Sequence, residues 1–107
     1  MDQKRLQDLI ERIAKYPTNI LDRFVLAKMY HDHQLWNNSV EECQKIITLK
    51  PDYLIVQMML GEGLLRMEQY SLARDTLHVA KELATRQNHV SLIPEIEDLL
   101  DEIPNYS

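Results

Sequence analysis

The sequence predicts an all-α protein, built as an array of about six short helices that pack in antiparallel pairs. The main observation is an internal repeat. Residues 26–51 match residues 60–85 in size and polarity when shifted by 34 positions, and the same shift places Pro51 on Pro17. A period of this length is typical of helical repeat proteins. The chain also holds only two glycines and four prolines, too few for the many tight turns of a sandwich or barrel.

The composition limits the classes of function. At 107 residues and 45% hydrophobic content, the chain is expected to form one ordered domain with a modest core. Its net charge of -5 and lack of a basic run argue against a nucleic-acid partner. No apolar segment approaches the roughly 20 residues that span a membrane. Charged residues interrupt the apolar ones in residues 1–10, unlike a secretory signal, so we expect a cytoplasmic protein.

Helical periodicity places the first three elements. Apolar residues at spacings of three and four predict a helix over residues 2–15, which Pro17 ends. Asn19 is expected to cap a second helix, whose apolar residues cover more than one face. Asn37 or Asn38 is expected to cap a third helix, which runs to Leu49.

The second half of the chain repeats this order. Residues 50–52 close the third helix and are expected to cap the fourth, over residues 54–67, which is again apolar on more than one face. Ser71 is expected to cap the fifth helix. A last amphipathic helix is predicted over residues 91–103, with Pro94 in its first turn, where the missing N–H is tolerated.

Two copies of one pattern stand in the same register. The first is Arg23-x2-Leu26-Ala27-x2-Tyr30, then Ser39-x3-Cys43, then Pro51, and the second is Gln57-x2-Leu60-Gly61-x2-Leu64, then Ala73-x3-Leu77, with Thr85 in place of proline. The pattern resembles the tetratricopeptide repeat (TPR), whose motif is W-x2-L-G-x2-Y, A-x3-F and P. Small residues at 27, 39, 61, 73 and 80 are expected to let paired helices approach closely. Neither copy has the first tryptophan, and Pro94 stands where a third copy would have leucine.

The resemblance implies a right-handed α-α superhelix, a TPR solenoid, as one domain. Residues 18–51 and 52–86 would be two full repeats. Residues 1–16 would form an N-terminal half repeat, and residues 90–104 a C-terminal capping helix that keeps the open end soluble.

The resemblance also implies a function. In TPR arrays the first helix of each pair lines a concave groove that holds a peptide or a partner helix. The groove-facing positions here would be Leu21, Phe24, Lys28, His31 and Asp32 in the first repeat, and Ile55, Met58, Glu62, Leu65 and Arg66 in the second. We expect a non-catalytic adaptor or scaffold whose partner is another protein or peptide. Alternatively, neighbouring helices cover the apolar members of this set, or two copies of the chain bury them in a self-associating module.

One TPR subclass grips the C-terminal carboxylate of heat-shock chaperones with Lys and Asn side chains. Val25 and Met59 occupy the two positions that correspond to its asparagine. We therefore do not predict that partner.

No residue pattern indicates catalysis, a cofactor or a metal. His31 and His33 lie two apart, so on a helix they point in nearly opposite directions, and zinc would need further ligands. Cys43 occupies a packing position of the repeat and is expected to be a buried, inert thiol. We therefore expect no enzyme activity, no metal and no cofactor.

Overall fold

Six α-helices and one short 3₁₀-helix make up most of the computed structural model, which describes residues 1–105. They are α1 (Gln3–Lys15), α2 (Ile20–Asp32), α3 (Trp36–Leu49), α4 (Leu54–Arg66), α5 (Tyr70–Arg86), the 3₁₀-helix η1 (Val90–Leu92) and α6 (Ile93–Asp101). No strand occurs in the described part of the chain. The all-α prediction is therefore confirmed.

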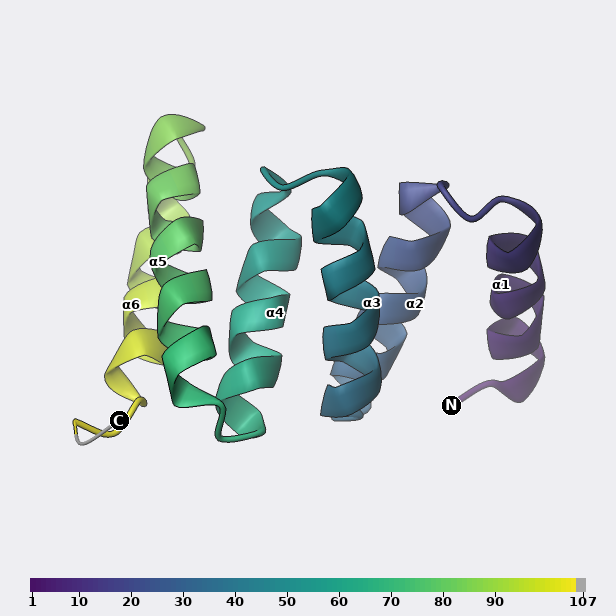
Figure 1. Cartoon of the computed structure of the whole chain (residues 1–107), viewed down its shortest axis with the longest axis horizontal. Helices are drawn as coiled ribbons and strands as arrows, with labels where there is room; N and C mark the ends of the chain where they lie inside the picture. The colour runs from purple at the N-terminus through teal and green to yellow at the C-terminus, as the bar shows by residue number, and fades with distance from the viewer. Residues whose placement is uncertain (106–107) are drawn as a thin grey trace.

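Consecutive helices run antiparallel and stand in a row, so the N-terminus and the C-terminal segment lie at opposite ends of the molecule (Figure 1). The molecule measures 41 × 28 × 21 Å along its principal axes. α2 packs on α3, α3 on α4, and α4 on α5, while α2 and α6 also contact α4. The helix α4 therefore lies between α2 and α6, although neither of them follows or precedes it directly in the sequence.

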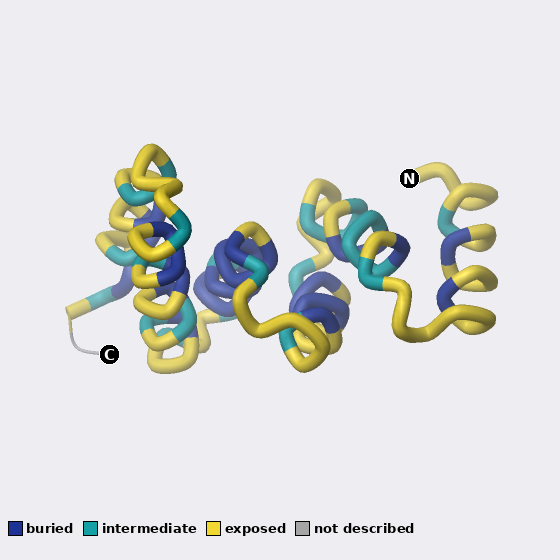
Figure 2. Tube along the Cα trace, turned by 90° about the horizontal axis from the view of Figure 1, so that it is seen from above, coloured by how far each residue is buried: buried dark blue, intermediate teal, exposed yellow. Residues whose placement is uncertain are grey.

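The centre of the core is α4. Ten of its thirteen residues are buried, and Figure 2 shows buried residues concentrated along the middle of the array. A Cβ atom added to Gly61 would lie 2.5 Å from Leu77 Cδ2 of α5, and one added to Gly63 would lie 2.7 Å from Val40 Cγ2 of α3. Real carbon atoms need more separation than this. The two glycines therefore allow α4 to approach its neighbours on both sides.

The first helix pair fills the corresponding space differently. Ala27 stands 34 residues before Gly61, and Cys43 stands 34 residues before Leu77. Ala27, Cys43 and Leu77 are all fully buried. Compared with the second pair, the first pair has the larger residue on its first helix, Ala27 against Gly61, and the smaller residue on its second helix, Cys43 against Leu77. The total volume matters at such a position because protein interiors are close-packed.

The period of 34 residues also appears in the hydrogen bonds. Arg23 Nε donates to the Pro17 carbonyl oxygen at 2.8 Å, and Gln57 Nε2 donates to the Pro51 carbonyl oxygen at 2.9 Å. Donor and acceptor are each displaced by one repeat. Both donors occupy the first motif position, where the TPR pattern has tryptophan. Each ties the loop before a helix to the second turn of that helix.

The turns after α2 and α4 share one backbone conformation. Gln34 and Glu68 have positive φ angles of 58° and 60°. After each of them, a backbone N–H reaches back five residues, from Leu35 to the Tyr30 carbonyl and from Gln69 to the Leu64 carbonyl, both at 2.9 Å. A left-handed residue followed by such a bond closes a helix C-terminus and satisfies its last carbonyls.

One of the predicted caps is confirmed and three are wrong. Asn19 Oδ1 accepts from the backbone N–H groups of Leu21 and Asp22. Asn37 and Asn38 lie inside α3, Ser71 lies inside α5, and Tyr53 rather than a residue of 50–52 precedes α4. For α3 and α5 the reason is the turn: the chain passes from the left-handed residue Gln34 or Glu68 through one further residue directly into the next helix. No side-chain cap forms there.

The two terminal helices pack in different ways. α1 packs on α2, and its Arg12 Nη2 lies 2.7 Å from Asp22 Oδ1, a carboxylate that is almost fully buried. At the other end, α6 packs on α5, and its Ile96 and Leu99 are buried. Pro94 lies in the first turn of α6, as predicted.

We predict that Gly61→Ala destabilises the protein by about 1–2 kcal/mol. Overpacking of a core costs roughly 1–3 kcal/mol, and the better helix propensity of alanine returns up to about 1 kcal/mol. Leu77 is fully buried, so it has no room to move aside. Urea unfolding followed by circular dichroism measures the change.

The control is a double-mutant cycle with Leu77→Cys, because the pair Gly61→Ala and Leu77→Cys gives α4 and α5 the residues found at 27 and 43. We expect the double variant to be more stable than the sum of the single effects predicts. Additive changes in the free energy of unfolding, or a stabilising effect of Gly61→Ala, would contradict the close contact between Gly61 and Leu77.

Cys43 is predicted to be unreactive in the folded protein. Burial raises the pKa of its thiol to about 11, and its Sγ atom lies 4.0 Å from Ser39 Oγ. At pH 8 the thiolate would be populated at only about one part in a thousand, and the thiolate is the reactive form. Labelling with a chromogenic disulfide should therefore follow unfolding, with urea-unfolded protein as the control. Complete labelling of the native protein within seconds would refute this.

Candidate functional site

The predicted site residues gather on the neighbouring helices α2 and α4, and α6 extends the same surface. His31 of α2 contacts Glu62 of α4, and Arg66 of α4 contacts Glu102, which directly follows α6. We call this surface the groove face, because three hollows described below lie along it. Whether a partner binds there is a prediction that the contacts within the chain do not test.

The apolar members of the predicted set divide into exposed and buried residues. Leu21 is 71% exposed and Ile55 is 40% exposed. Phe24 is partly buried, and its ring stacks on that of Tyr53 with centroids 5.6 Å apart. Met58 and Leu65 are buried in the core. An apolar partner would therefore meet Leu21, Phe24 and Ile55 first.

The charged members contact one another. Lys28 Nζ lies 3.1 Å from Asp32 Oδ2, and this hydrogen bond is the main cause that lowers the pKa of Asp32. His31 Nε2 lies 2.9 Å from Glu62 Oε1, and the ring of His31 meets Trp36 edge-on. The network links α2 to α4.

Arg66 extends this network to the end of α6. It contacts Glu62 Oε2 at 3.2 Å and Glu102 Oε1 at 2.7 Å. The hydrogen bond with Glu102 is the main cause that raises the pKa of Arg66. Residues from three parts of the groove face are thus joined by ion pairs and hydrogen bonds.

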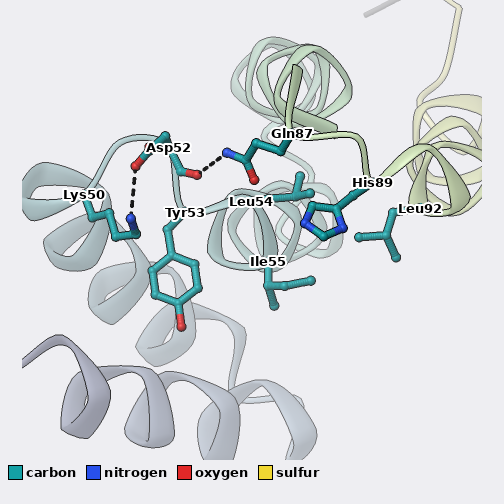
Figure 3. A pocket seen from close by; sticks show the side chains of 8 residues that line it. All are labelled: Lys50, Asp52, Tyr53, Leu54, Ile55, Gln87, His89 and Leu92. Atoms are coloured by element: carbon teal, nitrogen blue, oxygen red, sulfur yellow. Dashed lines mark hydrogen bonds and ion pairs between the residues drawn. The ribbon is translucent and has the colours of Figure 1, made fainter. Parts of the chain in front are cut away.

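The largest hollow has a volume of about 520 Å³ and lies at the start of α4 (Figure 3). Its walls come from residues 50–55 and from the segment after α5, and they consist of Lys50, Asp52, Tyr53, Leu54, Ile55, Gln87, His89 and Leu92. Gln87 Nε2 donates to the Asp52 carbonyl oxygen at 2.8 Å and closes one side. The hollow is large enough for one bulky apolar side chain of a partner.

Two smaller hollows continue the groove face. One of about 130 Å³ lies between α4 and α6, and its lining consists of His31 of α2 together with Ile55, Met58, Met59, Glu62, Glu95 and Leu99. Because Ile55 also lines the largest hollow, the two are adjacent. Another of about 280 Å³ lies between α1 and α2 and includes Arg5, Phe24 and Lys28.

Sequence reasoning missed Tyr53, His89, Leu92, Glu95 and Leu99 as lining residues. Four of them follow residue 86, where the second repeat ends, so the 34-residue period could not place them. Tyr53 had a weak signal: it is an aromatic residue in the loop directly before the most apolar helix.

Metal-binding clusters and membrane-spanning helices are both absent from residues 1–105. No group of three or more His, Cys, Asp or Glu side chains among residues 1–105 is arranged to hold a metal ion. None of the helices in that part of the chain has the length and apolar character needed to cross a membrane. His31 and Glu62 contact each other, and Cys43 is buried.

Comparison with known proteins identifies the fold. No family profile matches the chain, and no curated protein matches it. Among solved structures, the TPR2B domain of yeast Sti1 in complex with pHsp70 superposes with a TM-score of 0.80 at 18% identity, covering 92% of this chain and 78% of that one. A Bordetella parapertussis protein gives 0.78 at 20% identity, over 92% and 85% of the two chains.

A third structure, MamA MSR-1, gives a TM-score of 0.65 at 19% identity, covering 92% of this chain and 64% of that one. Identities at this level identify an architecture and do not transfer a partner. The helix order, the 34-residue period and these superpositions lead to one conclusion: the chain has the tetratricopeptide-repeat fold.

Proposed function

We propose that the chain is a non-catalytic protein-interaction module, an adaptor or scaffold of the cytoplasm, that binds a peptide or an amphipathic helix on its groove face. Leu21, Phe24, Lys28, His31, Ile55, Met58, Glu62, Leu65 and Arg66 are the proposed site, with Met58 and Leu65 supporting it from below. We further propose residues 18–51 and 52–86 as the two full repeats, 1–16 as the half repeat and 90–104 as the capping segment.

The observation that carries this proposal is the exposed apolar path into the largest hollow. Leu21 and Ile55 expose more apolar surface than a core position would. Phe24 stacks on Tyr53, and Tyr53 and Ile55 line the hollow. A helix with apolar residues three and four apart would place one side chain in the hollow and others along this path.

The solved structures support the class of function but not a partner. The Sti1 domain was solved in complex with pHsp70. In this chain, Val25 and Met59 stand where the chaperone-binding subclass has asparagine, and neither side chain can bind a carboxylate. We therefore propose an apolar rather than a carboxylate-directed mode of binding.

The test is a pair of matched double variants. Leu21→Asp/Ile55→Asp places charge on the apolar path, and Leu72→Asp/Val79→Asp places the same charge on exposed apolar residues of α5, outside the groove face. Helical peptides selected from a displayed library for binding the wild type are the probe. We expect the groove variant to weaken binding about tenfold or more, because it removes apolar contacts from both positions.

The control variant should bind as the wild type does, and circular dichroism should show equal helicity in all three proteins. If the groove variant and the control bind the peptides equally well, the groove face is not the binding site. If light scattering shows that the wild type doubles its mass with concentration and the groove variant does not, the alternative of a self-associating module holds instead.

A further inference from the structure

We propose that the partner segment is basic as well as amphipathic, with Lys or Arg side chains that lie over the α4–α6 end of the groove face. This inference rests on the proposed function, because it specifies the chemistry of the partner at the same site. Two sets of charges on the groove face support it: the basic groups, most of which are paired within the chain, and the acidic groups of α6, which are only partly paired.

Most basic groups of the groove face are paired within the chain. Lys28 contacts Asp32, Lys50 contacts Asp52, and Arg66 contacts both Glu62 and Glu102. An acidic partner would have to compete with these carboxylates for each cation. Among residues 1–105 the exception is Arg5, which lies at the opposite end, in the hollow between α1 and α2.

The acidic groups of α6 are only partly paired. Glu97 contacts Lys81 of α5, on the side away from the groove. Glu95 and Asp98 are exposed and make no ion pair with another described residue. Glu95 lines the hollow between α4 and α6, and Asp98 lies one turn further along α6, on the same face as Glu95 and Glu102. The uncompensated charge at this end is therefore negative.

The lining of the same hollow suits a long basic side chain. Ile55, Met58 and Leu99 provide apolar surface beside the Glu95 carboxylate. Lys and Arg bury their aliphatic stems on apolar surface while their charged ends remain hydrated or paired. The flexible methionine side chain adapts to such a stem. A free carboxylate beside apolar surface matches a cation on an aliphatic stem better than it matches a purely apolar or an acidic group.

The position of this hollow also fixes the order of features in the partner. Ile55 lines both this hollow and the 520 Å³ hollow, so the two sites share one residue of α4. A partner helix that places an apolar side chain in the 520 Å³ hollow therefore carries its basic residue within about one turn of it. The net charge of -5 would also speed the approach of a basic segment.

The experiment uses two designed amphipathic peptides as probes. Both carry the same leucine face and differ only in the flanking charged positions, which are lysine in one peptide and glutamate in the other. Fluorescence anisotropy measures their binding to the wild type, to Glu95→Gln/Asp98→Asn, and to the control Asp75→Asn/Glu82→Gln, which removes the same charge from exposed positions of α5.

We expect the lysine peptide to bind the wild type and the control about tenfold more tightly than the glutamate peptide, a preference that added salt reduces. The Glu95→Gln/Asp98→Asn protein should lose most of this preference. Equal binding of the two peptides, or an unchanged preference in that variant, overturns the basic partner and leaves the proposed function intact. If neither peptide binds, or if only self-association is observed, the proposed function fails as well.

Discussion

The close approach of α4 to the helices on both sides of it is the constraint on which the rest of the structure depends. The missing side chain of Gly61 leaves room for Leu77 of α5, and the missing side chain of Gly63 leaves room for Val40 of α3. Two glycines weaken an isolated helix by about 1 kcal/mol each, so α4 depends on its neighbours for stability. Burial of ten of its thirteen residues offsets that loss. Because α4 is fixed in this way, its remaining exposed side, with Ile55 and Glu62, becomes a fixed surface between α2 and α6.

The repeat period could be read from residue sizes, and so the helices and their order were predictable. The structural repeat goes further than residue identity. Arg23 and Gln57 have different chemistry, yet each donates to the carbonyl of the proline six residues before it. Gln34 and Glu68 both take a left-handed conformation, which residue type alone does not favour. The wrong caps at Asn38 and Ser71 have the same origin, since pattern rules assign a cap to a polar residue and cannot see a backbone turn that makes the cap unnecessary.

The candidate site was less predictable than the fold. Helical periodicity gives the direction of a side chain but not what covers it, so Leu21 and Met58 looked alike in the sequence. Leu21 is 71% exposed although the next residue, Asp22, is buried against Arg12 of α1, whereas Met58 belongs to the buried core. The placement of α6 follows from η1 and Pro94, where the register has already been lost. Glu95 and Leu99 therefore had no repeat position from which their place on the groove face could be inferred.

The ion pairs of the groove face are best understood as the framework of a preformed surface. The contacts from His31 to Glu62, and from Arg66 to Glu62 and Glu102, join three helices that are distant in sequence. Partly exposed pairs contribute little to stability individually, but together they restrict sliding of α2 and α6 against α4. A rigid surface spares a partner part of the ordering cost of binding. In the proposed function, the residues that fix the groove differ from those that contact a partner. The paired charges hold its shape, while Leu21, Ile55 and Glu95, which makes no ion pair with another described residue, remain for recognition.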